Sequence, residues 1–229
     1  MHISSTTNSS EAGTRLITML RLQHGINSKI NVAWVQAENP WYRAIWTECA
    51  EMMDHVGWKW WKKMEPDVEQ LHLELVDIFH FGLSELIVAN GSVDAARDAA
   101  QAAYQAIEAA SQIGKTEAGH VLKLIEGFAS ATLTTKSFAA DSFSELCVAV
   151  GLGGDELYRK YVGKNVLNTF RQDHGYKDGS YVKIWSGRED NEWLAEIGAK
   201  MQNVSEVFPT ELYQALEQAY RTHSVAQTK

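Results

Sequence analysis

Two pairs of acidic side chains in this 229-residue chain have the spacing of one helical turn. Glu48 and Glu51 lie three residues apart, and so do Glu74 and Asp77. Residues at this spacing share one face of a helix, so each pair would present its two carboxylates together. Acids in such a pattern usually form a solvated helix face, and the spacing alone favours that ordinary interpretation.

The residues around the second pair favour a different interpretation. Segment 67–90 is apolar nearly all round, which is typical of a buried helix. A buried, unpaired carboxylate costs on the order of several kcal/mol, so these acids must become neutral, meet a cation or line a wet cleft. Carboxylates converging from two neighbouring helices are the ligands that Mg²⁺ prefers, whereas no cysteines or histidines cluster with them as Zn²⁺ would require. The competing interpretation is internal ion pairing of the acids with Lys59, Lys62 or Lys63.

A basic stretch in the second half of the chain supplies the opposite charge. Residues 158–188 contain seven lysines and arginines against two acids, although the whole chain carries a formal charge of −8. Within the stretch, Lys164, Asn168 and Arg171 fall at i, i+4 and i+7, on one face of a helix. Such a stripe suits phosphate, and arginine favours bidentate contact. Acidic metal ligands and phosphate-binding cations together predict Mg²⁺-dependent attack on a polyphosphate.

Helices must position these side chains, and the sequence indicates where they lie. Apolar periodicity and terminal residues predict helices over 14–27, 41–56, 67–90, 93–113, 116–129, 138–150, 155–172, 193–201 and 209–220. Asp67 and Asp155 are the expected helix caps, and Asn90-Gly91 is an expected stop. Residues 181–185, after the turn at Asp178-Gly179, read as a short extended piece. We therefore expect an all-α helical bundle, with a flexible N-terminus over 1–13 and a single domain over 14–229.

Two further segments have ordinary interpretations. The alanine-rich segment 93–113 has small side chains that suit either close helix contact or a partly exposed arm. The glycines at 151, 153 and 154 lack the Gly-Lys-Ser/Thr ending of a phosphate-binding P-loop, so they indicate a helix stop. Cys49 and Cys147 have no metal-ligand spacing, and we expect them to be reduced and buried.

Composition limits the classes of protein that remain. Hydrophobic residues make up 45% of the chain and charged residues 22%, as in an ordinary globular protein. The negative net charge argues against duplex nucleic acid or an anionic membrane as the main partner. The polar start, MHISSTTNSSEAG, has no signal-peptide features, and no apolar run approaches the roughly 18 residues of a membrane span. We expect a cytoplasmic protein.

Three stretches of the sequence resemble the dimeric dUTPase family, one of the all-α nucleoside triphosphate pyrophosphohydrolases that also include MazG-like enzymes. They are ECAEMMDHVGWKWWKK (48–63), ELVDIFHF (74–81) and YVGKNVLNTFRQDHGYKDGSYVKIW (161–185). The ExxE…ExxD pattern is weak by itself, but together with KNxLNxFRQDxGYKxGxY it is specific. The resemblance covers roughly residues 15–90 and 138–200.

This resemblance implies a homodimer that converts dUTP, and generally dUDP, to dUMP, which limits uracil in DNA. It implies that more than one Mg²⁺ ion is held by Glu48, Glu51, Glu74 and Asp77, the first two of which would also activate the attacking water. The implied phosphate contacts are Lys164, Asn168, Arg171, Tyr176 and Lys183. The implied base and sugar contacts are Gln23, Asn27, Trp60, Asp77, His80 and Phe81. Asp77 would lie near the 3′-hydroxyl, and His80 and Phe81 would leave no room for a 2′-hydroxyl.

Some alternatives remain open at this point. Core packing explains Trp58 and Trp61 as well as a wall for a flat base does. Gln23 and Asn27 taken alone look like exposed helix residues, and an amide can present either donors or acceptors. The same chemistry on dCTP or a modified pyrimidine therefore stays possible. A non-catalytic helical binding protein is the alternative from another class, against which the four intact acids speak.

Overall fold

The computed structural model describes residues 4–110, 117–201 and 206–224, and it confirms the all-α prediction. Its helices are α1 (Ser4–Ile30), α2 (Trp41–Val56), α3 (Val68–Asn90), α4 (Val93–Ala109), α5 (Ala118–Thr135), α6 (Ala140–Ala149), α7 (Gly154–Asp173), α8 (Asp190–Lys200) and α9 (Phe208–His223). A short 3₁₀ helix, η1, covers Trp34–Gln36. Strands β1 (Ile184–Trp185) and β2 (Arg188–Glu189) form a small antiparallel hairpin.

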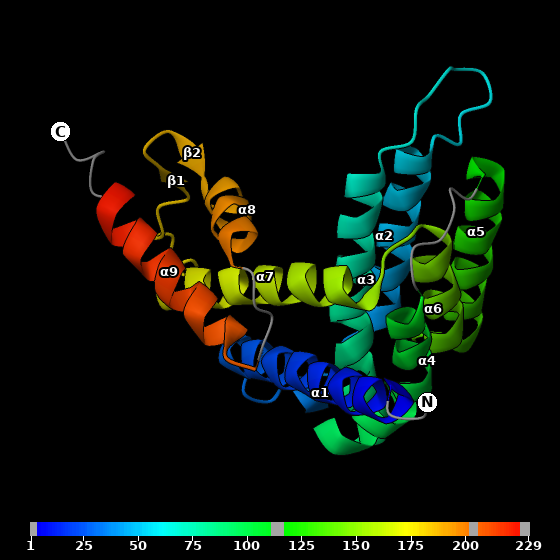
Figure 1. Cartoon of the computed structure of the whole chain (residues 1–229), viewed down its shortest axis with the longest axis horizontal. Coiled ribbons are helices and arrows are strands. Elements are labelled where there is room, and N and C mark those ends of the chain that lie inside the picture. The colour runs from blue at the N-terminus through cyan, green and yellow to red at the C-terminus, as the bar shows by residue number, and fades with distance from the viewer. Residues whose placement is uncertain (1–3, 111–116, 202–205, 225–229) are drawn as a thin grey trace.

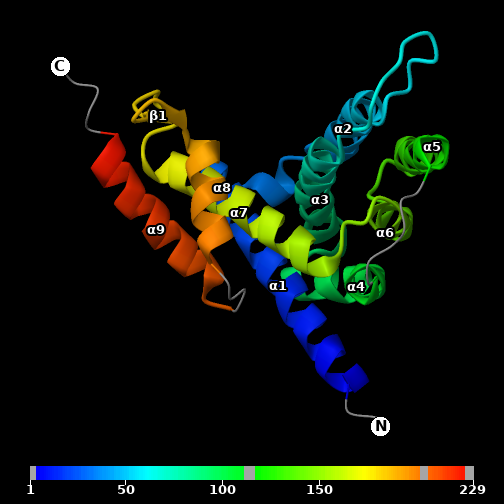
Figure 2. The same cartoon turned by 45° about the horizontal axis from the view of Figure 1, so that its top comes forward.

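The fold is built around a helical hairpin and two long helices that cross it. Helices α2 and α3 lie side by side and are joined by the loop 57–67 (Figure 1). Helix α5 packs on α2, whereas α1, α4 and α7 pack on α3. In Figure 2, α7 and α1 run between the group α4 to α6 on one side and α8, α9 and the β-hairpin on the other. The acidic hairpin and the basic helix α7 are thereby brought together.

Helix α2 has a narrow apolar stripe, which decides where its acids point. The buried residues Ile45, Cys49, Met52 and Val56 repeat at helical spacing and face the core. Glu48 lies half-buried at the edge of this stripe, and Glu51 is exposed. The stripe therefore turns both glutamates towards the boundary between the core and the solvent.

The ends of α2 and α3 are fixed by local interactions. Gly57 closes α2 in the left-handed conformation (φ 90°), and a Cβ there would lie 2.7 Å from the Cβ of Met64. Asp67 caps α3, as predicted, by accepting a hydrogen bond from the backbone N–H of Gln70 at 3.2 Å. The N–H of Asp67 also donates to the carbonyl of His55 at 2.9 Å, so it ties the two helix ends together.

Some predicted boundaries are wrong. Helix α1 begins at Ser4 rather than at residue 14. Helix α7 has Gly153 at its N-cap, so Asp155 lies in the first turn instead of capping it. Residues 111–113 and 116 of two predicted helices lie outside the described residues. The flexible N-terminus over 1–13 and the single domain over 14–229 stay predictions.

The alanine-rich helix α4 makes close helix contacts instead of forming an exposed arm. Its buried face packs against α1, α3 and α6. This face consists of Ala96, Ala100, Ala103, Tyr104 and Ile107. Cys49 and Cys147 are both free and buried, as expected. Among the described residues, no helix has the length and apolar character needed to cross a membrane.

Candidate active site

Three of the four predicted acids converge between α2 and α3. Each of Glu48, Glu74 and Asp77 places a carboxylate oxygen within 4.8 Å of an oxygen of the other two. Glu51 is exposed one turn beyond Glu48 and lies outside this group, but its negative charge acts on all three. The helical hairpin therefore builds the predicted cluster from three acids, with the fourth beside it.

The cluster is short of positive charge. Burial, followed by the charge of Asp77, raises the pKa of Glu48 to about 8. Burial also raises the pKa of Glu74, although a hydrogen bond with Glu48 acts in the opposite direction. Oxygen-only donors this close together fit a hard divalent cation such as Mg²⁺, because the ion would relieve their mutual repulsion.

A lysine and a histidine contact the cluster. Lys164 of α7 donates a hydrogen bond to Asp77, and burial raises the pKa of Asp77 in spite of that lysine. His55 places Nε2 at 3.3 Å from Glu74 Oε1. His55 thus lies beside one of the acids, and it follows Glu51 by one helical turn in the sequence. Among the described residues, no histidine or cysteine joins the group of three acids itself.

The alternative ion pairing proposed from the sequence involves other acids. Lys59 pairs with Asp54 at 2.9 Å, and Lys63 pairs with Glu65 at 3.2 Å. Lys62 is exposed on the same loop. The observed ion pairs of this loop thus leave the clustered carboxylates available to a ligand.

Lys164, Asn168 and Arg171 all lie on α7, as the predicted stripe requires, but Arg171 is already engaged in an ion pair. Arg171 donates from Nε and Nη2 to the two oxygens of Asp190, at 2.8 Å each. Asp190 is fully buried, and Tyr181 also donates to it at 2.8 Å. Burial disfavours the charged form, yet the bonds from Arg171 and Tyr181 hold the pKa of Asp190 below its usual value. The bidentate face of Arg171 therefore serves the fold, and its Nη1 donates to Asn168 Oδ1 at 3.3 Å.

The other two predicted phosphate contacts lie beyond the end of α7. Tyr176 is exposed. Lys183 is half-exposed and pairs with Glu189 across the β-hairpin at 2.9 Å. The structure thus joins Lys164 directly to the acidic cluster, whereas Tyr176 and Lys183 are displayed on the surface.

Gln23 and Asn27 are buried, which contradicts their appearance as exposed helix residues. Gln23 lies on the face of α1 that carries the buried residues Leu16 and Leu20, a signal that the apolar spacing already contained. Both amides donate to Ser84 Oγ of α3, at 3.0 and 2.9 Å respectively. The sequence analysis did not single out Ser84.

His80 and Phe81, predicted to pack on the deoxyribose, lie on α3 with Asp77. His80 stacks on Tyr161 with ring centroids 4.0 Å apart, and its Nδ1 donates to the carbonyl of Val76 at 2.8 Å. Burial lowers the pKa of His80 to about 3, so the ring is neutral. Its Nε2 is then a buried acceptor without a partner among the described residues. Phe81 packs against Trp41 with centroids 6.4 Å apart.

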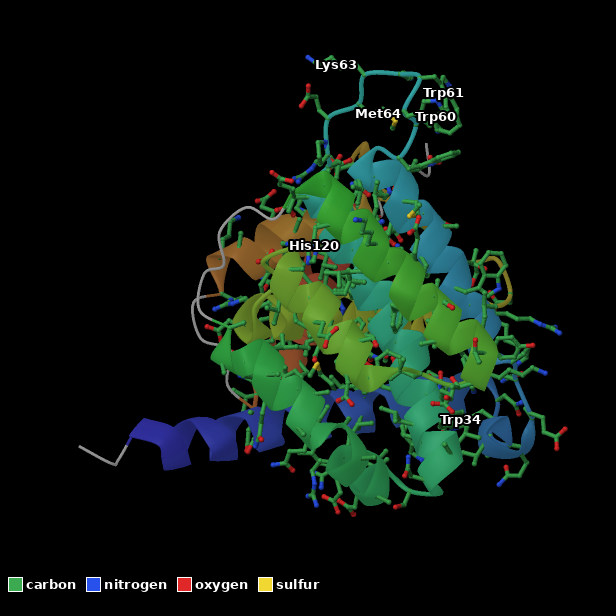
Figure 3. All side chains as sticks on the ribbon, turned by 90° about the vertical axis from the view of Figure 1, so that its right-hand side faces the viewer. Trp34, Trp60, Trp61, Lys63, Met64 and His120 are labelled. Atoms are coloured by element: carbon green, nitrogen blue, oxygen red, sulfur yellow. The ribbon has the colours of Figure 1, made fainter. Side chains whose placement is uncertain are left out.

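The tryptophans of the loop 57–67 are not core residues. Trp60 is 86% exposed and Trp61 59%, and their rings make an edge contact with centroids 4.4 Å apart. Figure 3 shows both at the tip of the loop, away from the helical body. Trp58 is partly exposed and donates to Asp54 at 2.7 Å. Core packing is therefore wrong for these side chains, and a wall for the base stays a prediction.

The fold and the site together define a class of protein. An all-α bundle with carboxylates clustered on a helical hairpin fits the MazG-like superfamily. The chain matches the family model described as dUTPase over residues 15–176, and it belongs to the dimeric dUTPase family. It is therefore a dUTP diphosphatase, an enzyme that hydrolyses dUTP. No curated protein matches the chain.

The matched region contains most of the residues discussed above. It includes both acid pairs, the amides of α1 and the stripe of α7. It also includes the alanine-rich helix α4, which the resemblance of short motifs does not cover. Lys183 lies beyond its end.

Proposed function

We propose that the protein is a Mg²⁺-dependent enzyme that converts dUTP and dUDP to dUMP and releases pyrophosphate from dUTP. It would act in the cytoplasm as a homodimer, with no nucleic acid or membrane partner, and so limit uracil in DNA. The observation that carries this proposal is the convergence of three carboxylates from α2 and α3 next to Lys164 of α7.

In this proposal the acids divide two tasks. Mg²⁺ ions, more than one, would be held by Glu48, Glu51, Glu74 and Asp77. When bound, they polarise the phosphoryl oxygens and stabilise developing negative charge. Glu48 accepts a proton from the attacking water on a carboxylate oxygen, with Glu51 assisting. The position of Glu48 in the cluster with Glu74 and Asp77 supports this role, because a general base must lie within reach of the water that it deprotonates.

The substrate would contact α7 through its phosphates and α1 through its base. Lys164, Asn168, Arg171, Tyr176 and Lys183 would contact the phosphates. Gln23 and Asn27 would read the base, with Trp60 as a wall. Asp77 would lie near the 3′-hydroxyl, and His80 and Phe81 would pack on the deoxyribose and exclude a 2′-hydroxyl.

Replacing Lys164 by alanine should raise the KM for dUTP by about 10- to 100-fold, the range that a lost charge-assisted hydrogen bond gives. The ammonium would otherwise exchange Asp77 for a phosphate oxygen. Steady-state kinetics with purified enzyme measure the change. Lys160→Ala is the matched control, since Lys160 lies one turn earlier on α7 and pairs with Glu69 and Glu156. An unchanged KM in the Lys164 variant would contradict the phosphate stripe.

A panel of deoxynucleoside triphosphates, each assayed with Mg²⁺ and scored by pyrophosphate release, tests the whole proposal. We expect selective hydrolysis of dUTP, and loss of that activity when a chelator removes the metal. A preference for dCTP would favour the alternative base. Nucleotide binding without hydrolysis of any substrate would favour the non-catalytic alternative.

A further inference from the structure

Buried polar side chains of α1, α3 and α7 form a hydrogen-bond network. The donor and the acceptor of each of its bonds can be assigned. Its members are Gln23, Asn27, Ser84, Tyr161 and Asn165. We propose that Ser84 fixes the orientation of the Gln23 and Asn27 amides, and that this orientation selects a 4-oxo pyrimidine over a 4-amino one. The inference rests on the proposed role of these amides in reading the base. Gln23 acts in this role only through Asn27, because its own two N–H protons and two oxygen lone pairs are all used within the network.

The hydroxyl proton of Ser84 determines which groups in the network donate and which accept. Ser84 Oγ lies 2.9 Å from the backbone carbonyl of His80, and a carbonyl can only accept a hydrogen bond. The single hydroxyl proton of Ser84 is therefore used in the hydrogen bond to that carbonyl. Any other group bonded to Ser84 Oγ must donate. Both amides lie at that distance, so each must turn its NH₂ towards Ser84.

The amide oxygen of Gln23 is held in the same orientation by other hydrogen bonds. Its Oε1 lies 2.7 Å from the hydroxyl of Tyr161 and 3.3 Å from Nδ2 of Asn165, and both groups can donate to it. Tyr161 and Asn165 are buried, and the Tyr161 ring is stacked on His80. Reversing the Gln23 amide would place its oxygen against the lone pairs of Ser84 and leave buried groups without partners. The amide is thus fixed from both ends.

In this fixed orientation, Asn27 keeps one hydrogen-bond acceptor and one donor that are free for a base. Its Oδ1 accepts from Gln23 Nε2 at 3.2 Å, which leaves one lone pair, and its Nδ2 donates to Ser84, which leaves one N–H. One acceptor beside one donor complements the N3–H and C4=O of uracil. Cytosine presents an acceptor at N3 and a donor at its 4-amino group, so it requires the reversed amide. Asn27 is the member of the amide pair with more exposure, at 9% against 5% for Gln23.

The test is the ratio of kcat/KM for dUTP to that for dCTP, with both substrates measured on one preparation. The fraction of correctly folded enzyme cancels in this ratio, so a purely structural effect would not change it. We expect Ser84→Ala to lower the ratio at least about tenfold, the discrimination of one properly paired hydrogen bond. Tyr161→Phe, which releases the other end of Gln23, should lower it in the same direction. Ser144→Ala is the matched control, because Ser144 makes an equivalent hydroxyl-to-carbonyl bond on α6, to Asp141 at 2.8 Å.

The possible results separate this inference from the proposed function. If the wild-type ratio is high and Asn27→Ala lowers it, the base lies where we propose. An unchanged ratio in both Ser84→Ala and Tyr161→Phe would then overturn the orientation mechanism alone. A wild type without preference for dUTP, or an Asn27→Ala variant with the wild-type ratio, would refute the base assignment and this inference with it. Should Ser84→Ala fail to fold, Tyr161→Phe decides the question.

Discussion

Replacing Glu48 by glutamine should lower kcat for dUTP by about 10²- to 10⁴-fold, the range for removal of a general base. Glutamine keeps the shape of the side chain and one oxygen, but it cannot take a proton from water. Burial and the charge of Asp77 raise the pKa of Glu48 to about 8, and the pKa values of Glu74 and Asp77 are raised as well. Binding of dUTP, measured by calorimetry with Mg²⁺, should change much less than turnover.

The control for this substitution is Glu145→Gln, which removes the charge of an exposed glutamate on α6. It should leave both kcat for dUTP and the affinity for dUTP unchanged. Near-wild-type turnover in the Glu48 variant would remove this residue from the catalytic set. A loss of binding as large as the loss of turnover would instead assign Glu48 to ligand binding alone.

Replacing Arg171 by alanine should lower the free energy of unfolding by about 3–5 kcal/mol, the cost of leaving a buried charge without its partner. Asp190 is fully buried and receives two of the guanidinium hydrogen bonds. Chemical denaturation of the nucleotide-free protein measures the loss. Activity of this variant should be assayed well below its melting temperature, so that unfolding is not mistaken for weaker phosphate binding.

Two comparisons isolate the buried pair. Lys183→Ala breaks a half-exposed ion pair in the adjacent hairpin and should cost only about 0–1 kcal/mol. Adding Asp190→Ala to the Arg171 variant should lower the free energy of unfolding little further, or should restore it, because the double variant no longer contains the unpaired buried charge. Equal losses in the Lys183 and Arg171 variants would disprove the structural role of the pair.

The helices that carry the acids could be predicted from the sequence because their signals are local. The bounds of α2 agree with the predicted 41–56, and α3 lies inside the predicted 67–90 with Asp67 as its cap. In both, apolar spacing and terminal residues act within a few turns. The start of α1 escaped prediction, because the polar residues before position 14 have no apolar periodicity.

Features of the site that depend on tertiary contacts could not be predicted. Asp190 is nineteen residues from Arg171, and nothing in the local sequence distinguishes it from a surface acid. Ser84 meets the amides of α1 from a residue about sixty positions away. Tryptophan is usually buried, so core packing stayed open for Trp58 and Trp61, and the structure exposes both. Such partners become visible only when the helices are packed.

The protruding loop between α2 and α3 has a practical consequence for handling the enzyme. Its exposed Trp60, Trp61, Lys62 and Lys63 offer bonds that chymotrypsin and trypsin prefer, and proteases cut exposed loop tips first. The cut would separate the two acid pairs into different fragments, which the packing of α2 on α3 would keep together. Slower nicking in the presence of a nucleotide would then show, without any assay of catalysis, that ligand binding protects this loop.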